Sequence, residues 1–143
     1  MVRAVLDAGV LVSALITPAG TTARLLRAWE EGRFELIVSP VLLEELGTVL
    51  MREKFRSYVD EREARAYVAL LRNQAIVVED PAEAPRATPD PKDDYLPALA
   101  DAAHAHVLVS GDPDLTETPG FSVPVLTPRH FLDSLSTPDR NPL

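Results

Sequence analysis

Carboxylates stand at two places where an apolar segment of the sequence ends. Asp7 follows the apolar run 2–6, and Asp112 and Asp114 follow the run 107–110. An ionised carboxylate beside an apolar core is unfavourable unless it is hydrogen-bonded, paired or bound to a cation. Two interpretations are therefore open: these acids ligate a metal, or they have local roles, an N-cap for Asp7 and an Asx turn for Asp112 and Asp114.

Helical geometry separates the neighbouring acids Glu44 and Glu45. The segment that starts at Ser39-Pro40 is expected to be a helix, because an N-cap residue is followed by proline at the first helical position. Successive side chains of a helix are turned by about 100°. Glu45 therefore lies at the border of the apolar face, whereas Glu44 points away from it towards solvent. Glu45 is the better site candidate.

The same geometry separates Asp93 from Asp94 in a helix expected over residues 93–104. Asp93 lies near the apolar face, and Asp94 or Asp101 is expected to face water. Pro97 is compatible with this helix only if the helix begins near Asp93 or Asp94, because proline in a helix interior removes a hydrogen bond. Such a start places the Asp93 charge at a helix N-terminus, where it is favoured.

Short apolar segments alternate with helical patterns along the chain. Strands are expected over 2–6, 34–38, 75–78, 107–110 and 123–126. Helices are expected over 10–15, from Thr21 or Thr22 as the cap to Gly32, and over 39–51, 58–73, 93–104 and 127–135. This alternation without hairpin signals predicts an α/β fold, a three-layer sandwich with a mostly parallel central sheet. Residues 1–135 are expected to form a single domain, and residues 136–143 a flexible tail.

The carboxyl ends of parallel strands share one edge of the sheet, where ligand sites usually lie. Asp7 and Asp112 are therefore expected to be neighbours there. Carboxylates that meet at one point repel one another unless a cation balances their charge. Ligands that are all oxygen suit Mg²⁺ or Mn²⁺, and such an ion beside a phosphodiester supports metal-assisted hydrolysis.

The composition limits the classes of function. The chain has 143 residues, no cysteine and a formal net charge of −8, so disulfides, thiolate metal sites and a cysteine nucleophile are excluded. A protein that binds nucleic acid through bulk charge is basic, so a nucleic-acid ligand would need divalent cations or a local basic patch here. No apolar run is long enough for a membrane span and no secretory signal is recognisable, so a cytoplasmic location without membrane association is expected.

A few basic residues could form such a patch. The segment MREKFR is the densest group, and the candidates for holding an RNA backbone are Arg24, Arg52, Lys54, Arg56 and Arg129. Ordinary solvated surface charge is the alternative interpretation of these residues.

Four segments, taken in order, resemble the motifs of the PIN domain. They are VLDAGVLVSAL, SPVLLEEL, DPKDDYLPALA and VLVSGDPDL, and the likeness extends over nearly the whole chain. It is greatest to VapC-like toxin components of bacterial and archaeal toxin–antitoxin pairs. No single motif is specific, but the four in this order and spacing are.

The resemblance implies a metal-dependent endoribonuclease, the toxin of a toxin–antitoxin pair, that hydrolyses RNA phosphodiesters with Mg²⁺ or Mn²⁺. Carried over residue by residue, the catalytic and metal-binding acids are Asp7, Glu45, Asp93 and Asp112, the set selected above, with Asp114 as a further metal ligand. Ser13 and Ser110 match polar positions of the motifs. The partners implied are an RNA substrate, a cognate antitoxin that blocks the site, and further copies of the chain in a homodimer or tetramer.

The sequence departs from the family pattern at Gly9. The first motif usually reads Asp-Thr-Asn, and Gly9 supplies no amide to orient the site. A catalytically weakened PIN-like module that binds RNA or protein is therefore the alternative function. A phosphatase-like domain is disfavoured, because its second aspartate would stand at Gly9. The chain also contains neither a P-loop nor a Gly-x-Gly-x-x-Gly motif for nucleotide binding.

Overall fold

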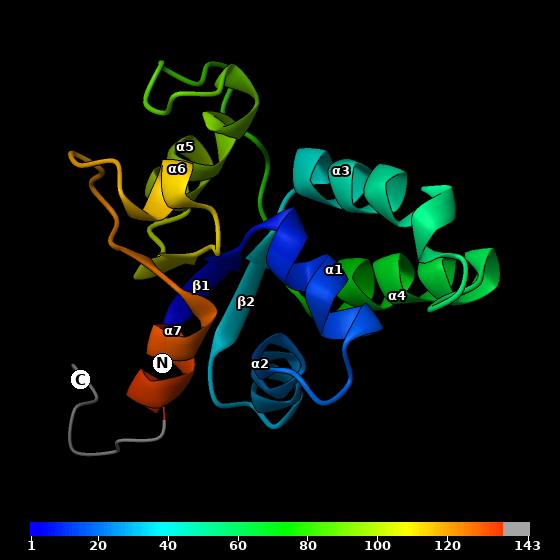
Figure 1. Ribbon diagram of the computed structural model, residues 1–143. Coiled ribbons are helices and arrows are strands. Elements are labelled where there is room, and N and C mark those ends of the chain that lie inside the picture. The colour runs from blue at the N-terminus through cyan, green and yellow to red at the C-terminus, as the bar shows by residue number, and fades with distance from the viewer. Residues whose placement is uncertain (136–143) are drawn as a thin grey trace.

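Five short parallel strands form the centre of the molecule. The structure is a computed structural model that describes residues 1–135, and its strand order is β3-β2-β1-β4-β5 (Figure 1). The strands are β1 (Arg3–Leu6), β2 (Glu35–Val38), β3 (Ile76–Val77), β4 (Val107–Val109) and β5 (Val125–Leu126). The three central strands are buried and have nearly continuous apolar sequences, as is typical of a parallel sheet covered on both faces.

Helices connect the strands and cover the sheet. They are α1 (Ala8–Ile16), α2 (Thr21–Glu30), α3 (Pro40–Leu50), α4 (Glu61–Gln74), α5 (Tyr95–Ala102), α6 (Pro113–Thr116) and α7 (Pro128–Leu135), with short 3₁₀ helices η1 (Glu53–Phe55) and η2 (Pro91–Asp93). The chain moves from β1 to β3 in one direction and then crosses to β4 and β5 on the other side of β1. Because crossovers between parallel strands are right-handed, α1 to α4 lie on one face, and α5 and α6 on the other.

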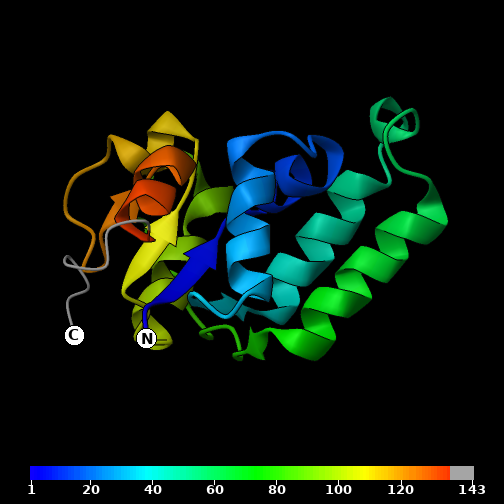
Figure 2. The same ribbon diagram turned by 90° about the horizontal axis from the view of Figure 1, so that it is seen from below.

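The arrangement of these helices agrees with that topology. Helix α1 packs against α2 and α3, α3 packs against α4, and α5 packs on β1 and β4. Figures 1 and 2 show α3 and α4 side by side, away from α5. The prediction of an α/β fold with a parallel central sheet is confirmed.

A polar residue follows each of the three central strands at the same edge of the sheet. In the parallel register Val5 is opposite Ile37, and Leu6 is opposite Val109. The residues that directly follow β1, β2 and β4 are Asp7, Ser39 and Ser110, and all three are buried. The apolar strands thus deliver polar groups to one place.

Local signals in the sequence explain where most helices begin. As predicted, Ser39 caps α3: its hydroxyl oxygen accepts a hydrogen bond from the Leu42 amide at 3.2 Å, and Pro40 opens the helix. The predicted threonine cap of α2 is wrong, because Gly20 is the N-cap and no side chain bonds to the helix end. Gly32 follows α2 with a φ of 77°, as a helix-ending glycine often does.

Helix α4 begins later than the apolar pattern predicted. The expected start was residue 58, but the helix begins at Glu61 because Asp60 and Glu63 form a reciprocal capping box. Asp60 accepts from the Glu63 amide at 2.7 Å, and these hydrogen bonds lower the pKa of the Asp60 carboxyl. Tyr58 lies outside the helix, and 64% of it is exposed.

Pro97 lies in the first turn of α5, where the missing amide hydrogen has no helical partner to lose. The helix expected over 93–104 is therefore two elements, η2 and the shorter α5. Asp93 ends η2, and Asp94 lies between the two elements.

The remaining expectations concern the C-terminal tail and membrane-spanning helices. Residues 136–143, the predicted tail, lie outside the described residues. Within residues 1–135 no single helix has the length and apolar character needed to cross a membrane. Helices α1 and α2 meet those requirements only when taken together, and they are bent by 96° to each other.

Candidate metal centre

Asp7 is held at the end of β1 by contacts to two other elements. Its backbone amide donates to the Val109 carbonyl at 3.0 Å, which continues the pairing of β1 with β4. Its Oδ1 accepts from the Val10 amide at 2.8 Å and caps α1, and its Oδ2 accepts from the Ser110 hydroxyl. The N-cap interpretation of Asp7 is therefore confirmed. Capping is compatible with a place among the other acids, because Asp7 stays at the carboxyl end of β1.

The Asp7 carboxylate is only 8% exposed. Burial raises the pKa of this carboxyl above its ordinary value, the hydrogen bonds from Ser110 and Val10 oppose that rise, and the nearby charges of Asp112 and Glu45 add to it. Asp7, which follows β1, therefore lies close enough to Glu45 of α3 and to Asp112 for their charges to act on it.

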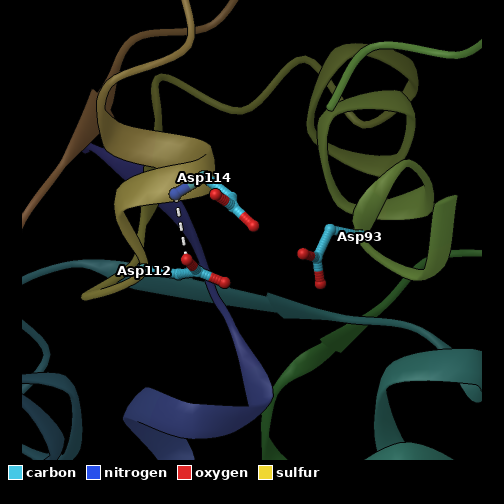
Figure 3. A group of neighbouring side chains, drawn as sticks. All are labelled: Asp93, Asp112 and Asp114. Atoms are coloured by element: carbon cyan, nitrogen blue, oxygen red, sulfur yellow. Dashed lines mark hydrogen bonds between the residues drawn. The ribbon is translucent and has the colours of Figure 1, made fainter. Parts of the chain in front are cut away.

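Asp112 begins α6 in the way the Asx-turn interpretation predicted. Its Oδ1 accepts from the Asp114 amide at 2.9 Å, and its own amide donates to the Ser110 hydroxyl oxygen at 3.0 Å. Because of this Asx turn, the side chains of Asp112 and Asp114 point towards the same space (Figure 3). The local role and the site role are compatible here as well.

Asp93 faces these two residues from the opposite side. Figure 3 shows the three carboxylates converging, with Asp93 at the junction of η2 and α5. One oxygen from each of Asp93, Asp112 and Asp114 lies within 4.8 Å of the other two. Unit charges about 4 Å apart repel by about 4 kcal/mol near a protein surface, so this convergence favours a cation.

Burial and that repulsion both raise the pKa of the Asp93 carboxyl. Burial raises this pKa to about 6, and the charges of Asp112, Asp90, Glu45 and Asp114 contribute to the rise. Three oxygen donors with excess negative charge suit a hard divalent cation such as Mg²⁺ or Mn²⁺. The donor set therefore fits the metal that the sequence predicted.

Glu45 reaches the same space from α3, as its position at the border of the apolar face predicted. Glu44 is exposed, also as predicted. The Tyr95 hydroxyl donates a hydrogen bond to Glu45 Oε2 across 50 positions of sequence. Burial, this hydrogen bond and the charges of Glu45, Asp7 and Asp80 raise the pKa of Tyr95 well above its ordinary value, so its hydroxyl stays protonated and can donate.

Sequence reasoning missed Tyr95 and Asp80. Tyr95 had one available signal, a hydroxyl on the segment that carries Asp93. Asp80 follows β3, and its Oδ2 accepts from the Val41 amide at 2.9 Å, which fixes the start of α3. Its other oxygen is buried and has no hydrogen-bond partner within residues 1–135.

A cavity of about 380 Å³ lies beside the predicted acids. Four of the five predicted acids line it, and the full lining is Asp7, Ala8, Gly9, Val10, Ser13, Thr22, Glu45, Asp93, Leu96, Gly111, Asp112 and Pro128. Ser13 accepts a hydrogen bond from the Thr22 hydroxyl at 2.9 Å, so this serine joins α1 to α2 at the cavity wall. Gly9 leaves room there, because a Cβ atom at this position would lie 3.4 Å from Asp7 Oδ1, an ordinary contact.

The prediction that Asp94 faces water is wrong, since only 3% of Asp94 is exposed. Its Oδ1 accepts hydrogen bonds from the Thr88 amide at 2.8 Å, the Thr88 hydroxyl at 2.7 Å and the Ala87 amide at 3.2 Å. Its Oδ2 pairs with Arg86 Nε at 3.0 Å. The helical projection failed because it considers one helix alone, whereas loop residues 86–88 pack on Asp94 and bond to its carboxylate.

The basic candidates do not form one patch. Arg24 and Arg129 are exposed on α2 and α7, within two residues of the cavity-lining Thr22 and Pro128. The MREKFR segment follows the end of α3 that lies farther from β1 (Figure 1).

Within that segment the three basic side chains differ. Arg52 and Lys54 are exposed, and Lys54 Nζ lies 5.1 Å from the centre of the Phe55 ring. Arg56 turns inward: its guanidinium donates to the Leu50 carbonyl, and its Nε and Nη1 are buried. Arg56 is therefore poorly placed to contact a phosphate.

Comparison with solved structures finds the same fold in proteins of low sequence identity. PAE2754 from Pyrobaculum aerophilum is 20% identical, with 94% of this chain and 90% of that chain covered and a TM-score of 0.66. VapBC2 from Rickettsia felis, bound to a DNA fragment from its promoter, is 12% identical, with coverages of 87% and 98% and a TM-score of 0.64. VapC20 from Mycobacterium tuberculosis, a toxin that cleaves the sarcin–ricin loop, is 17% identical, with coverages of 78% and 91% and a TM-score of 0.54.

Comparison with curated protein sequences finds no significant match. The family model described as PIN domain matches residues 3–114, a range that runs from β1 to Asp114 and so includes all five predicted acids. The sheet order, the acids at its carboxyl edge and this match agree, and the chain belongs to the PIN domain family.

Proposed function

We propose that this protein is a metal-dependent endoribonuclease and the toxin of a toxin–antitoxin pair. The observation that carries the proposal is the convergence of Asp93, Asp112 and Asp114 oxygens within 4.8 Å, beside a cavity that Asp7, Glu45, Asp93 and Asp112 line. A purely structural role does not account for so many like charges in one place, because their repulsion opposes folding.

Asp93, Asp112 and Asp114 are the residues that would hold Mg²⁺ or Mn²⁺ directly. Such an ion, when bound, supplies Lewis acidity and an activated water for phosphodiester hydrolysis. Asp7 and Glu45 complete the negative charge of the cavity, and each is oriented by a hydroxyl donor, Ser110 and Tyr95 respectively. These two hydrogen bonds orient the carboxylates at the site.

An RNA substrate fits the remaining features of the cavity. Its phosphates would bring more negative charge to a chain of net charge −8, so divalent cations must offset the repulsion. Arg24 and Arg129 flank the cavity and are proposed to contact the RNA backbone; Arg52 and Lys54 are placed to contact only a longer RNA. The similarity of the fold to VapC20, a sarcin–ricin loop cleaving toxin, supports structured RNA as the test substrate.

The partners proposed follow from the same comparison. VapBC2 is similar to this chain over most of its length, and its structure contains DNA from the promoter. We infer a cognate antitoxin that covers the cavity, assembly into a homodimer or tetramer, and a cytoplasmic location.

A catalytically weakened module that binds RNA or protein is the second candidate. Gly9 favours it, because this residue has no side chain that could supply the amide usually found beside Asp7. Under this alternative the metal and the RNA bind, but phosphodiesters are not cleaved.

The deciding experiment is cleavage of a labelled structured RNA with Mn²⁺, with excess EDTA, and with the Asp7→Asn variant. We expect Mn²⁺-dependent cleavage that EDTA and Asp7→Asn abolish. Glu44→Gln is the matched control, since it removes an exposed charge next to Glu45 and should leave cleavage unchanged. Cleavage that survives EDTA would refute the metal-dependent mechanism, and RNA binding without cleavage would favour the module.

A further inference from the structure

Asp93 occupies a weakly supported part of the chain. It ends the single turn of η2, where its amide donates to the Asp90 carbonyl at 3.0 Å and the Asp90 side chain accepts from the Lys92 amide. Its carboxylate accepts no hydrogen bond from residues 1–135, although it faces Asp112 and Asp114. Like charges therefore push this side chain away from the site while its own turn offers little resistance.

The neighbouring Asp94 is held in the opposite way. Both of its oxygens are engaged, Oδ1 by the Ala87 amide and the Thr88 amide and hydroxyl, and Oδ2 by Arg86. These donors all come from the long loop that precedes η2. Asp94 thereby closes residues 86–94 into a ring of hydrogen bonds at the start of α5.

Burial strengthens this ring. Only 3% of Asp94 and 6% of Thr88 are exposed, whereas the Arg86 side chain is 66% exposed and contributes less. The Thr88 hydroxyl lies between Asp94 Oδ1 and the Asp90 carbonyl and shares its single hydrogen between these two acceptors, so it also connects the ring to the turn that carries Asp93. Hydrogen bonds to a buried carboxylate are short, charge-assisted and strongly directional.

We infer that Asp94 is a positioning residue that fixes the 86–94 loop and so holds Asp93 against the repulsion of Asp112 and Asp114. This inference rests on the proposed metal site and adds a residue that acts on it from outside. Groups that orient a metal ligand without touching the ion typically contribute roughly 10- to 100-fold to metal affinity.

The test measures Mn²⁺ binding to the full chain by electron paramagnetic resonance, alongside the melting temperature of the metal-free protein. We expect Asp94→Asn to weaken Mn²⁺ binding by roughly 10- to 100-fold at temperatures where the variant is fully folded. Asp101→Asn removes the same charge from an exposed position of α5 and should leave Mn²⁺ binding unchanged.

Thr88 variants provide a milder test if Asp94→Asn folds poorly. Thr88→Val removes the hydroxyl that donates to Asp94 and should weaken Mn²⁺ binding, whereas Thr88→Ser keeps the hydroxyl and should restore it. A purely structural role would lower the melting temperature without changing the Mn²⁺ affinity of the folded protein.

The outcomes separate this inference from the proposed function. Unchanged Mn²⁺ affinity in Asp94→Asn and Thr88→Val would overturn the positioning role while the nuclease proposal stands. Weakened Mn²⁺ binding in these variants, in a protein that cleaves no RNA, would support the positioning role and refute the nuclease. Absence of Mn²⁺ binding by the unaltered protein would overturn both.

Discussion

Asp7 and Ser110 are separated by 103 positions of sequence, and the Ser110 hydroxyl donates a hydrogen bond to the Asp7 carboxylate. Parallel pairing of β1 with β4 places both residues at the same edge of the sheet. Ser110 also accepts from the Asp112 amide. One buried hydroxyl thus links the first acid of the chain to the segment that carries two others.

Replacing Ser110 with alanine should destabilise the fold. The change leaves the buried Asp7 carboxylate without one donor and the Asp112 amide without its acceptor, and each such loss typically costs about 1–3 kcal/mol. Urea unfolding would measure the free energy. Ser57→Ala, at an exposed position, is the control and should change it little. Equal unfolding free energies for the two variants would contradict the structural role of this hydroxyl.

The stability of the metal-free protein should depend on the protonation of Asp93. Its pKa is raised from an ordinary value of 3.8 to about 6 on folding. A group whose pKa is raised on folding stabilises the folded state fully at a pH below its pKa in the unfolded chain. This stabilisation is lost as the pH rises through its pKa in the folded protein.

The unfolding free energy in EDTA should therefore decline from about pH 4 to about pH 7, relative to that of Asp93→Asn, in which this group does not titrate. Urea unfolding of both proteins across this range measures the difference. Parallel pH profiles for the two would show that the pKa of Asp93 is not raised on folding.

Removing one charge from the cluster should have opposite effects with and without metal. Asparagine at position 112 can still cap α6, so Asp112→Asn should relieve repulsion and keep or raise the melting temperature in EDTA. The rise in melting temperature on adding Mn²⁺ should shrink, because a ligand stabilises only as far as it binds: about 2.7 kcal/mol at 100 times its Kd. The Glu44→Gln control should keep the full rise. If Asp112→Asn also kept the full rise in melting temperature on adding Mn²⁺, Asp112 would be excluded as a ligand.

Restoring an amide beside Asp7 should increase RNA turnover. Gly9→Asn places its Cβ atom at an ordinary contact distance from Asp7, and the substitution suits a helical position better than glycine does. We expect turnover to rise by roughly tenfold or more, the usual contribution of a group that orients a carboxylate of a metal site by a hydrogen bond.

Gly47→Asn is the matched control for this substitution, because it adds the same side chain to open space on α3. Its effect on turnover should be negligible. If Gly9→Asn also left turnover unchanged, the missing amide would not be what limits this chain.

Local sequence determined the elements and most of their ends. Apolar runs marked the strands, Ser39-Pro40 marked the start of α3, and the helical period placed Glu45 at the cavity and Glu44 in solvent. These features depend on residues within one or two turns of each other, so periodicity and capping chemistry suffice to predict them. Asp7 and Asp112 were predictable as neighbours, because the carboxyl ends of parallel strands lie at one edge.

Only the tertiary structure decided how the side chains at that edge are oriented. A helical projection considers one helix alone, and the loop residues 86–88 that bond to Asp94 reversed its expected burial. The bond between Tyr95 and Glu45 joins positions 50 residues apart, and the inward turn of Arg56 depends on the end of α3. Such contacts are set by how distant segments pack, because desolvation and repulsion act between neighbours in space rather than neighbours in sequence.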